Sequence, residues 1–185
     1  MKNPHPFECL STTAQKRLFV VLLMLTLAVM GGLQVFDAPL KTEAAPWGIV
    51  SLEFAGSLTG ARQIIASWGP KGAVYAGLNL GLDFLFLFSY AGAIGLGCVL
   101  AARSLSTHMK PFSFFGAPLA WGQLCAALLD ATENIGLIQI LMGAESEIWP
   151  KLAFWCAIPK FLIVAAGLLY LLVSVFLLVI RKPQT

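Results

Sequence analysis

The residues in this sequence that are best suited to chemistry are acidic and amide side chains inside a long apolar run. Residues 124–140, LCAALLDATENIGLIQI, contain Asp130, Glu133 and Asn134. On a helix with 3.6 residues per turn, these three residues and Gln123 fall on one stripe roughly 100° wide. An ionised acid in lipid costs several kcal/mol unless another group compensates its charge. We therefore expect this stripe to face protein or a water-filled cavity rather than lipid.

Two other apolar runs carry ionisable side chains at a similar depth. Asp83, Glu133 and Lys160 each lie eight or nine residues from the same end of their apolar runs. With a rise of 1.5 Å per residue, this spacing corresponds to about 12–14 Å below one membrane surface. Asp130 lies one turn deeper. We expect these four side chains to meet at nearly one level of a helix bundle.

Each run also shows one polar stripe at this level. In the second run, Asn79, Asp83 and Tyr90 are spaced by four and seven residues, and in the fourth run Lys160 shares a face with Gly167 and Ser174. We expect these stripes to converge on the bundle interior. The predicted ligand-binding or ion-pair cluster consists of Asn79, Asp83, Tyr90, Gln123, Asp130, Glu133, Asn134 and Lys160.

The charges of the predicted cluster do not balance. Three acids and one base give a charge of −2 if all of them ionise, and burying that charge without compensation is too costly. Either at least one carboxyl group is protonated at neutral pH, or a cation or positive ligand group enters. The alternative interpretation is that the cluster only fixes the register and pairing of the helices.

The composition is that of a membrane protein. Of the 185 residues, 58% are hydrophobic and 11% are charged, whereas soluble domains contain about 25% charged residues. The net charge of +3 is small and the basic residues are dispersed, which argues against a nucleic-acid-binding protein. No cysteine pair has metal-ligand spacing, and His5 and His108 lie in tails or loops. We expect no metal site, and the sequence identifies no cofactor.

Four long apolar runs predict an all-α membrane protein with four transmembrane helices in an antiparallel bundle. The first run, of about 19 residues, exceeds the roughly 7–15 residues of a signal-peptide core and lacks a cleavage site, so a retained helix is favoured over a cleavable signal peptide. Each run is long enough to cross ~30 Å of hydrocarbon. We expect a single membrane domain over residues 1–185, with spans at about 18–36, 75–102, 112–142 and 152–180.

Residues 37–74 form the only long loop, and its middle predicts a short amphipathic helix at about 57–68. Ser57 is a suitable N-cap, and Gly69 with Pro70 is a stop signal. The helix is too short and too polar to cross a membrane, so it should lie along the surface or cover the bundle. Its predicted apolar face consists of Phe54, Leu58, Ala61, Ile65 and Trp68, with Glu53 off this face.

The basic residues predict that both termini lie in the cytoplasm. Seven of them lie at the chain ends and in the 103–111 loop, and four lie on the opposite side over a longer length. The positive-inside rule therefore predicts a multi-pass protein of the inner or plasma membrane, with the 37–74 loop outside. The first group is Lys2, Lys16, Arg17, Arg103, Lys110, Arg181 and Lys182, and the second is Lys41, Arg62, Lys71 and Lys151.

The segments GIVSLEFAGS, ASWGP, LGLDFLFLFSYA, LLDATEN and AIPKF resemble a family of small four-helix bacterial integral membrane proteins. The resemblance covers roughly residues 48–170. It implies the four-span layout and implies no activity. A four-span bundle with acidic groups facing an outer pocket is also similar in architecture to the sterol-isomerase and sigma-2 type of membrane proteins, although no motif of that group is matched.

Two classes of function follow from these patterns. The first is a binding or transport module in the lipid bilayer, in which the acids are counter-charges for a small amphiphile, a lipophilic or cationic ligand, or a proton. The second is a structural or accessory subunit, with a membrane protein or a second copy of the chain as its partner. An enzyme is a weaker hypothesis, because no nucleophile motif, metal set or phosphate loop is present.

Overall fold

The structure is a computed structural model that describes residues 4–106 and 109–180, and every regular element in these ranges is a helix. Four segments are long and apolar enough to cross a membrane, which confirms the predicted all-helical architecture with four candidate spans. The remaining residues, among them Lys2, His108, Arg181 and Lys182, lie outside the described ranges. The elements are α1 (Thr12–Asp37), η1 (Ala38–Leu40), α2 (Ile49–Glu53), α3 (Leu58–Leu105), α4 (Lys110–Ser113), α5 (Gly116–Leu141) and α6 (Ile148–Ile180).

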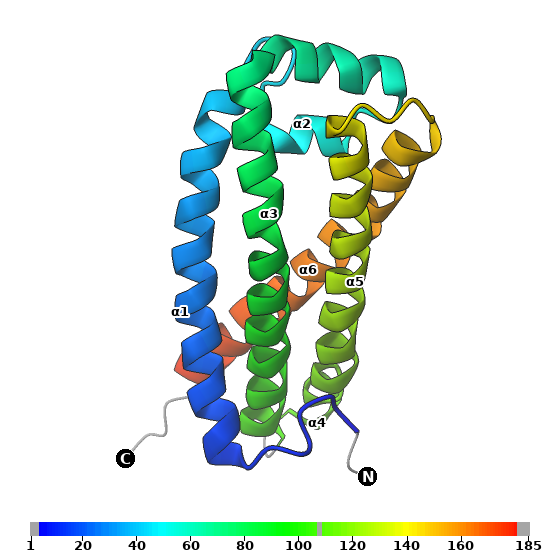
Figure 1. Cartoon of the computed structure of the whole chain (residues 1–185). Helices are drawn as coiled ribbons and strands as arrows, with labels where there is room; N and C mark the ends of the chain where they lie inside the picture. Colours follow the sequence, from blue (N-terminus) through cyan, green and yellow to red (C-terminus); the bar gives the residue numbers. More distant parts are fainter. Residues whose placement is uncertain (1–3, 107–108, 181–185) are drawn as a thin grey trace.

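Helix α3 is the central element of the bundle. It packs against α1, α5 and α6, and α5 also packs against α6. The start of α1, the end of α6 and α4 lie at one end of the bundle, which we call the termini end (Figure 1). Helix α2, the first turns of α3 and the turn after α5 lie at the other end, which we call the loop end.

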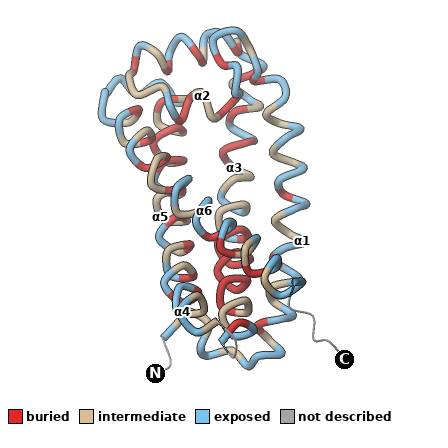
Figure 2. Tube along the Cα trace, turned by 180° about the vertical axis from the view of Figure 1, so that it is seen from behind, coloured by how far each residue is buried: buried red, intermediate tan, exposed pale blue. Residues whose placement is uncertain are grey.

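The outside of the bundle is apolar. Large hydrophobic side chains on all four long helices are exposed, for example Met24, Phe88, Leu128 and Leu172. Buried residues follow the inner sides of α3 and α5, and α1 is exposed over most of its surface (Figure 2). Contiguous exposed apolar surface of this kind is unfavourable in water, whereas it matches the hydrocarbon of a bilayer.

The predicted loop helix forms, and its backbone leaves the helical conformation at Gly69, the stop signal that the sequence indicates. Helix α3 begins at Leu58, and the Ser57 side chain accepts a hydrogen bond from the Gly60 backbone N–H at 3.2 Å, which confirms the N-cap. At Gly69 the backbone is non-helical with φ of 63°, a conformation that favours glycine. A second helical stretch follows and runs to Leu105, so α3 consists of two helical stretches joined by a kink at Gly69.

The first part of α3 lies across the loop end of the bundle (Figure 1). Leu58, Ala61 and Trp68 are buried, as their spacing predicts, and the Trp68 indole N–H donates to the Leu40 carbonyl at 2.7 Å. The prediction is less accurate at Ile65, which is only partly buried, whereas its neighbour Ile64 is buried.

Helix α2 is a short element that the sequence pattern did not predict. The two glycines that flank it, Gly48 and Gly56, have φ of 62° and 64°, where a Cβ atom is disfavoured. The carboxylate of Asp37, at the end of α1, accepts a hydrogen bond from the Ile49 N–H at 2.8 Å and fixes the start of α2.

The expected position of Glu53 is wrong. Glu53 is buried, with 8% of its surface exposed, and so is its neighbour Leu52. The chain turns at Gly56, so residues 49–53 belong to a separate helix. The periodicity of residues 57–68 therefore does not determine which way Glu53 points.

The contact between Trp68 and Leu40 predicts a measurable stability difference. Replacement of Trp68 by Phe leaves the buried carbonyl of Leu40 without its donor, and it should lower the free energy of unfolding by about 1–3 kcal/mol. Unfolding of the purified protein in mixed detergent micelles measures this change. Trp47→Phe is the matched control because Trp47 is 72% exposed. Equal stability of the two variants would contradict the hydrogen bond.

Candidate functional site

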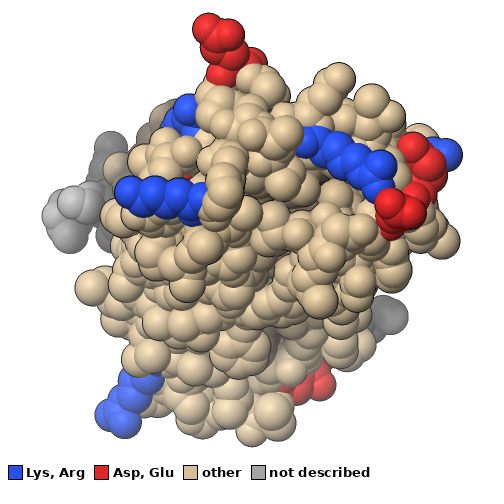
Figure 3. Space-filling model, turned by 45° about the horizontal axis from the view of Figure 1, so that its top comes forward, with Lys and Arg blue, Asp and Glu red and all other residues tan. Residues whose placement is uncertain are grey.

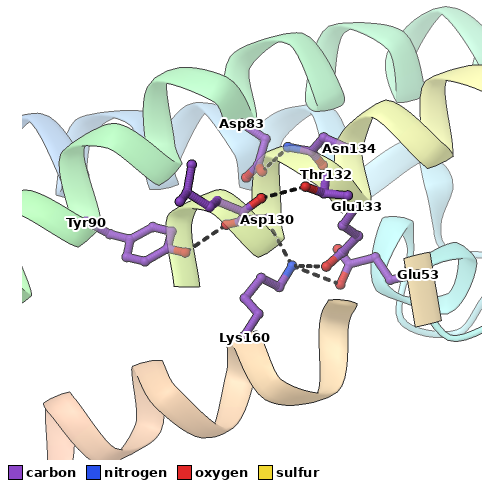
Figure 4. Close-up of polar contacts among 9 residues, drawn as sticks. Glu53, Asp83, Tyr90, Asp130, Thr132, Glu133, Asn134 and Lys160 are labelled. Carbon is purple, nitrogen blue, oxygen red and sulfur yellow. Dashed lines mark hydrogen bonds and ion pairs between the residues drawn. The ribbon is translucent and has the colours of Figure 1, made fainter. Parts of the chain in front are cut away.

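Five ionisable side chains from four helices meet inside the bundle (Figure 4). Helix α2 contributes Glu53, α3 contributes Asp83, α5 contributes Asp130 and Glu133, and α6 contributes Lys160. We call these five residues, together with Tyr90 and Asn134, the acidic cluster.

The Lys160 ammonium group lies at the centre of the acidic cluster. Its Nζ atom is 2.8 Å from Glu133 Oε2, 3.0 Å from Asp130 Oδ1 and 3.6 Å from Glu53 Oε2. A lysine ammonium has three N–H groups, so one buried cation is shared by three carboxyl groups. The side chain of Lys160 is almost fully buried.

Two further hydrogen bonds extend this arrangement across the bundle. The Tyr90 hydroxyl donates to Asp130 Oδ2 at 2.9 Å, so both oxygens of Asp130 are engaged. The Asn134 amide donates to Asp83 Oδ2 at 2.6 Å. Through these contacts, side chains of α3, α5 and α6 are held in register with one another.

Apolar side chains enclose the acidic cluster along the bundle axis. Towards the loop end lie Leu52, Leu80 and Leu137, and towards the termini end lie Ile94 and Tyr170, all of them buried. Glu53, Asp130, Glu133 and Lys160 are buried between these layers, and Asp83 is partly buried. In such surroundings the attraction between opposite charges is stronger than in water, and so is the penalty for any charge left without a partner.

The acidic cluster contains more acid than base. Four carboxyl groups and one ammonium give −3 if all ionise, one unit more than the sequence predicted, because Glu53 is added. Glu133 is fully buried, and its Oε1 accepts no hydrogen bond within the described part of the chain. Burial raises the pKa of Glu53, although the nearby Lys160 ammonium acts in the opposite direction. Such a site is stabilised by added positive charge.

The structure brings together six of the eight residues predicted for the site. The other two, Asn79 and Gln123, form hydrogen bonds to backbone carbonyls of neighbouring helices instead. The Asn79 amide donates to the Leu33 carbonyl of α1 at 3.1 Å, and the Gln123 amide donates to the Ile163 carbonyl of α6 at 3.1 Å. The six that the structure groups are Asp83, Tyr90, Asp130, Glu133, Asn134 and Lys160.

Glu53 is the site residue that the sequence pattern missed. The signal that could have identified it is weak: a single acid within the short apolar stretch of residues 49–54, followed closely by Gly56. Five residues are too few for a helical period to be recognised. Its burial depends on where the turn at Gly56 directs α2.

Aromatic rings lie between the acidic cluster and the outside of the bundle. Phe54 stacks on Phe161 with ring centroids 5.9 Å apart and meets Phe154 edge-on at 6.0 Å. Lys160 Nζ lies 4.6 Å from the centroid of Phe161, a cation–π contact. Because Phe54 and Phe161 are about 40% exposed, this aromatic group reaches the bundle surface.

Within residues 4–106 and 109–180, no group of three or more His, Cys, Asp or Glu side chains is arranged so that it could hold a metal ion. Comparison with known proteins gives no match to a protein-family model, to a curated protein or to a solved structure. The family resemblance therefore stays an expectation, and the function has to be inferred from the site.

The position of Lys160 predicts thermodynamic coupling between Lys160 and individual acids. Removal of one partner of a buried ion pair typically costs about 3–5 kcal/mol, less where the stranded acids become protonated. Lys160→Met should therefore destabilise the protein. Part of the loss should be recovered when Glu133→Gln or Asp130→Asn is added.

A double-mutant cycle in mild detergent measures this coupling. Asp83→Asn is the control, because the hydrogen bond of Asp83 goes to Asn134 and no ion pair joins it to Lys160 in the described structure. Its coupling energy should be the smallest. If neither Asp130 nor Glu133 shows coupling above ~0.5 kcal/mol, the Lys160 contacts are not those of the folded protein.

Proposed function

We propose that this chain is a single-domain, multi-pass membrane protein with four antiparallel transmembrane helices, and that its acidic cluster binds or transports positive charge. The cargo is a small cation, the cationic group of a small amphiphile, or a proton. Four apolar segments of sufficient length and an apolar exterior support the membrane assignment.

The observation that carries this proposal is the excess of acid in the acidic cluster, where Glu53, Asp130 and Glu133 are buried and Asp83 is partly buried. Four carboxyl groups surround or adjoin one ammonium, and Glu133 is fully buried with an oxygen that has no donor among the described residues. A cluster that only joined helices would need no more acids than bases, because each ion pair requires one of each. Each additional buried carboxylate is costly unless it gains a proton or a cation.

The surroundings of Lys160 support an ammonium group as the cationic part of a ligand. The region already accommodates one ammonium, between carboxyl groups and the ring of Phe161. Aromatic faces combined with carboxylates are a frequent means of binding alkylated amines. Helix α2 carries Glu53 and adjoins Phe54, so a movement of this helix about Gly48 and Gly56 would open the site from the loop end.

The charges at the two ends support cytoplasmic termini in the inner or plasma membrane. At the loop end, basic residues alternate with acids (Figure 3): Arg62 pairs with Glu145 at 3.3 Å, and Lys41 lies 3.8 Å from Asp37. In the sequence, seven basic residues belong to the chain ends and the 103–111 loop, and four belong to the opposite side over a longer length of chain. An excess of Lys and Arg is typical of the cytoplasmic side.

A structural or accessory role is the second candidate. It is favoured by the internal partners of Asp130, which accepts from Tyr90 and Lys160, and of Asp83, which accepts from Asn134. Contacts of this kind can fix helix register in a membrane without a ligand. The loop end would then be the surface for a membrane protein partner or a second copy of the chain.

A binding measurement separates the two candidates. The probe is octylammonium, with octanol as the uncharged control, added to the purified protein in a neutral detergent. Binding of octylammonium at about 100 times its Kd should stabilise the fold by about 2.7 kcal/mol and should release protons into a weakly buffered solution. Octanol should do neither.

Variants of single acids assign this effect to the acidic cluster. Glu133→Gln and, as a less buried alternative, Glu53→Gln should reduce the stabilisation and the proton release. Glu43→Gln should leave both unchanged, because Glu43 is an exposed acid at the same end. If Glu133→Gln and Glu53→Gln respond to octylammonium as the unmodified protein does, the structural role is correct.

The proposed orientation predicts which positions can be labelled from outside intact cells. In variants with a single added cysteine, an impermeant thiol reagent should label Glu43→Cys and should not label Thr185→Cys until the membrane is permeabilised. Labelling of Thr185→Cys in intact cells would reverse the orientation, whatever the result for ligand binding.

A further inference from the structure

A second site lies at the termini end, away from the acidic cluster. It is a cavity of about 1090 Å³ between the segment that precedes α1 and the neighbouring ends of α3, α4 and α5. The segment crosses the termini end from α1 towards α5 (Figure 1). Cavities of this size accommodate small organic ligands and lipid headgroups.

Specific contacts hold the segment before α1 in place, so the cavity has a defined wall. The Gln15 amide donates to the Phe7 carbonyl at 2.8 Å and to the Leu10 carbonyl at 3.0 Å. The Trp121 indole on α5 donates to the Pro4 carbonyl at 3.3 Å. These bonds tie both ends of the segment to the long helices.

Two cationic side chains line the cavity from different helices, Arg103 on α3 and Lys110 on α4. Neither forms an ion pair with a carboxylate in the described ranges. One Arg103 nitrogen, Nη1, donates to the Thr12 hydroxyl at 2.7 Å, which leaves most of the guanidinium N–H groups available. A guanidinium and an ammonium beside one cavity form a common arrangement for phosphate binding.

The same cavity also presents hydrogen-bond acceptors. Gln15 lines the cavity, and its buried Oε1 has no donor within the described part of the chain. Glu8 also lines the cavity, and burial lowers the pKa of its neighbour His5, which favours the neutral imidazole near pH 7. A ligand that fits both sets of groups carries an anionic phosphate for the cations and hydroxyl groups for the acceptors.

We infer that this cavity binds an anionic phosphate ester that carries hydroxyl groups, held by Arg103 and Lys110. A glycerophospholipid of the membrane or a free glycerol phosphate could supply this chemistry. The lipid is favoured by the apolar lining from Val99 and Ala117, which suits an acyl chain. The inference depends on none of the residues of the acidic cluster.

The test compares three probes with the purified full-length protein in neutral detergent, with native mass spectrometry and titration as the readouts. The probes are short-chain phosphatidylglycerol, phosphatidylcholine of the same chain length, and glycerol 1-phosphate. Phosphatidylglycerol should bind about tenfold more tightly than phosphatidylcholine, because its headgroup is anionic and donates hydrogen bonds.

The variant Arg103→Gln/Lys110→Gln should lose about tenfold in affinity for phosphatidylglycerol, the size expected for lost charge-assisted hydrogen bonds. Lys16→Gln/Arg17→Gln is the control, because it removes the same charge at the same end from residues that do not line this cavity. It should keep its affinity. An equal loss in both variants would show attraction to surface charge alone and would overturn the inference.

Two further results complete the test. Arg103→Lys keeps the charge but loses the planar donor set, so its affinity for phosphatidylglycerol should fall by less than that of the double variant. If the affinity is unchanged in either variant, the inference is overturned. Binding of glycerol 1-phosphate that depends on Arg103 and Lys110 identifies the free ester as the source of the phosphate, and such binding of phosphatidylglycerol alone identifies the lipid. The double variant should still be stabilised by octylammonium, because the acidic cluster is intact. A failure of the phosphate-binding inference can therefore be distinguished from a failure of the proposed function.

Discussion

The contact on which the rest of the structure depends is the buried ion pairing of Lys160. Its ammonium lies within 4 Å of Glu53, Asp130 and Glu133 and so joins α2, α5 and α6 at one point. An ammonium buried without a counter-charge would be strongly unfavourable, so the depth and rotation of α6 are restricted to those that keep Lys160 beside the acids. Asp130 extends the restriction to α3 through the Tyr90 hydroxyl.

The acidic cluster contains more acids than bases, and this excess affects which charges the site can hold as well as how the helices pack. A single Lys160 cannot neutralise four carboxyl groups, and apolar residues are buried on both sides of them along the bundle axis, where charges are poorly solvated. The cluster is therefore most stable when it holds further positive charge. Positive charge can arrive as protons, or as a cation that displaces them, which is how binding and proton release become linked in the proposed function.

The four long helices and the level of the acids could be predicted because both depend on distances along one helix. Ser57 as an N-cap and Gly69 as a break are local signals of the same kind, although the chain resumes its helix after Gly69. Lys160 and Glu133 could be placed at one depth because the helical rise is constant.

The remaining features depend on contacts between helices, which a single sequence does not encode in its spacing. Glu53 enters the cluster because Gly56 turns α2 inward, and no periodicity over five residues indicates that direction. Asn79 and Gln123 share stripes with cluster residues, yet they bond to carbonyls of α1 and α6. A polar side chain on an inner stripe can satisfy a neighbouring helix as well as a site, and only the packing decides between them.

The central claim is that the acidic cluster holds positive charge in addition to Lys160, and infrared spectroscopy of its carboxyl groups tests it most directly. In purified protein freed of small cations at neutral pH, the carbonyl stretch of at least one protonated carboxyl group should be present. It should weaken in Glu133→Gln or Glu53→Gln and grow in Lys160→Met. If the spectrum contains no protonated carboxyl group under these conditions, all four acids are ionised beside one ammonium, and the account of the cluster is contradicted.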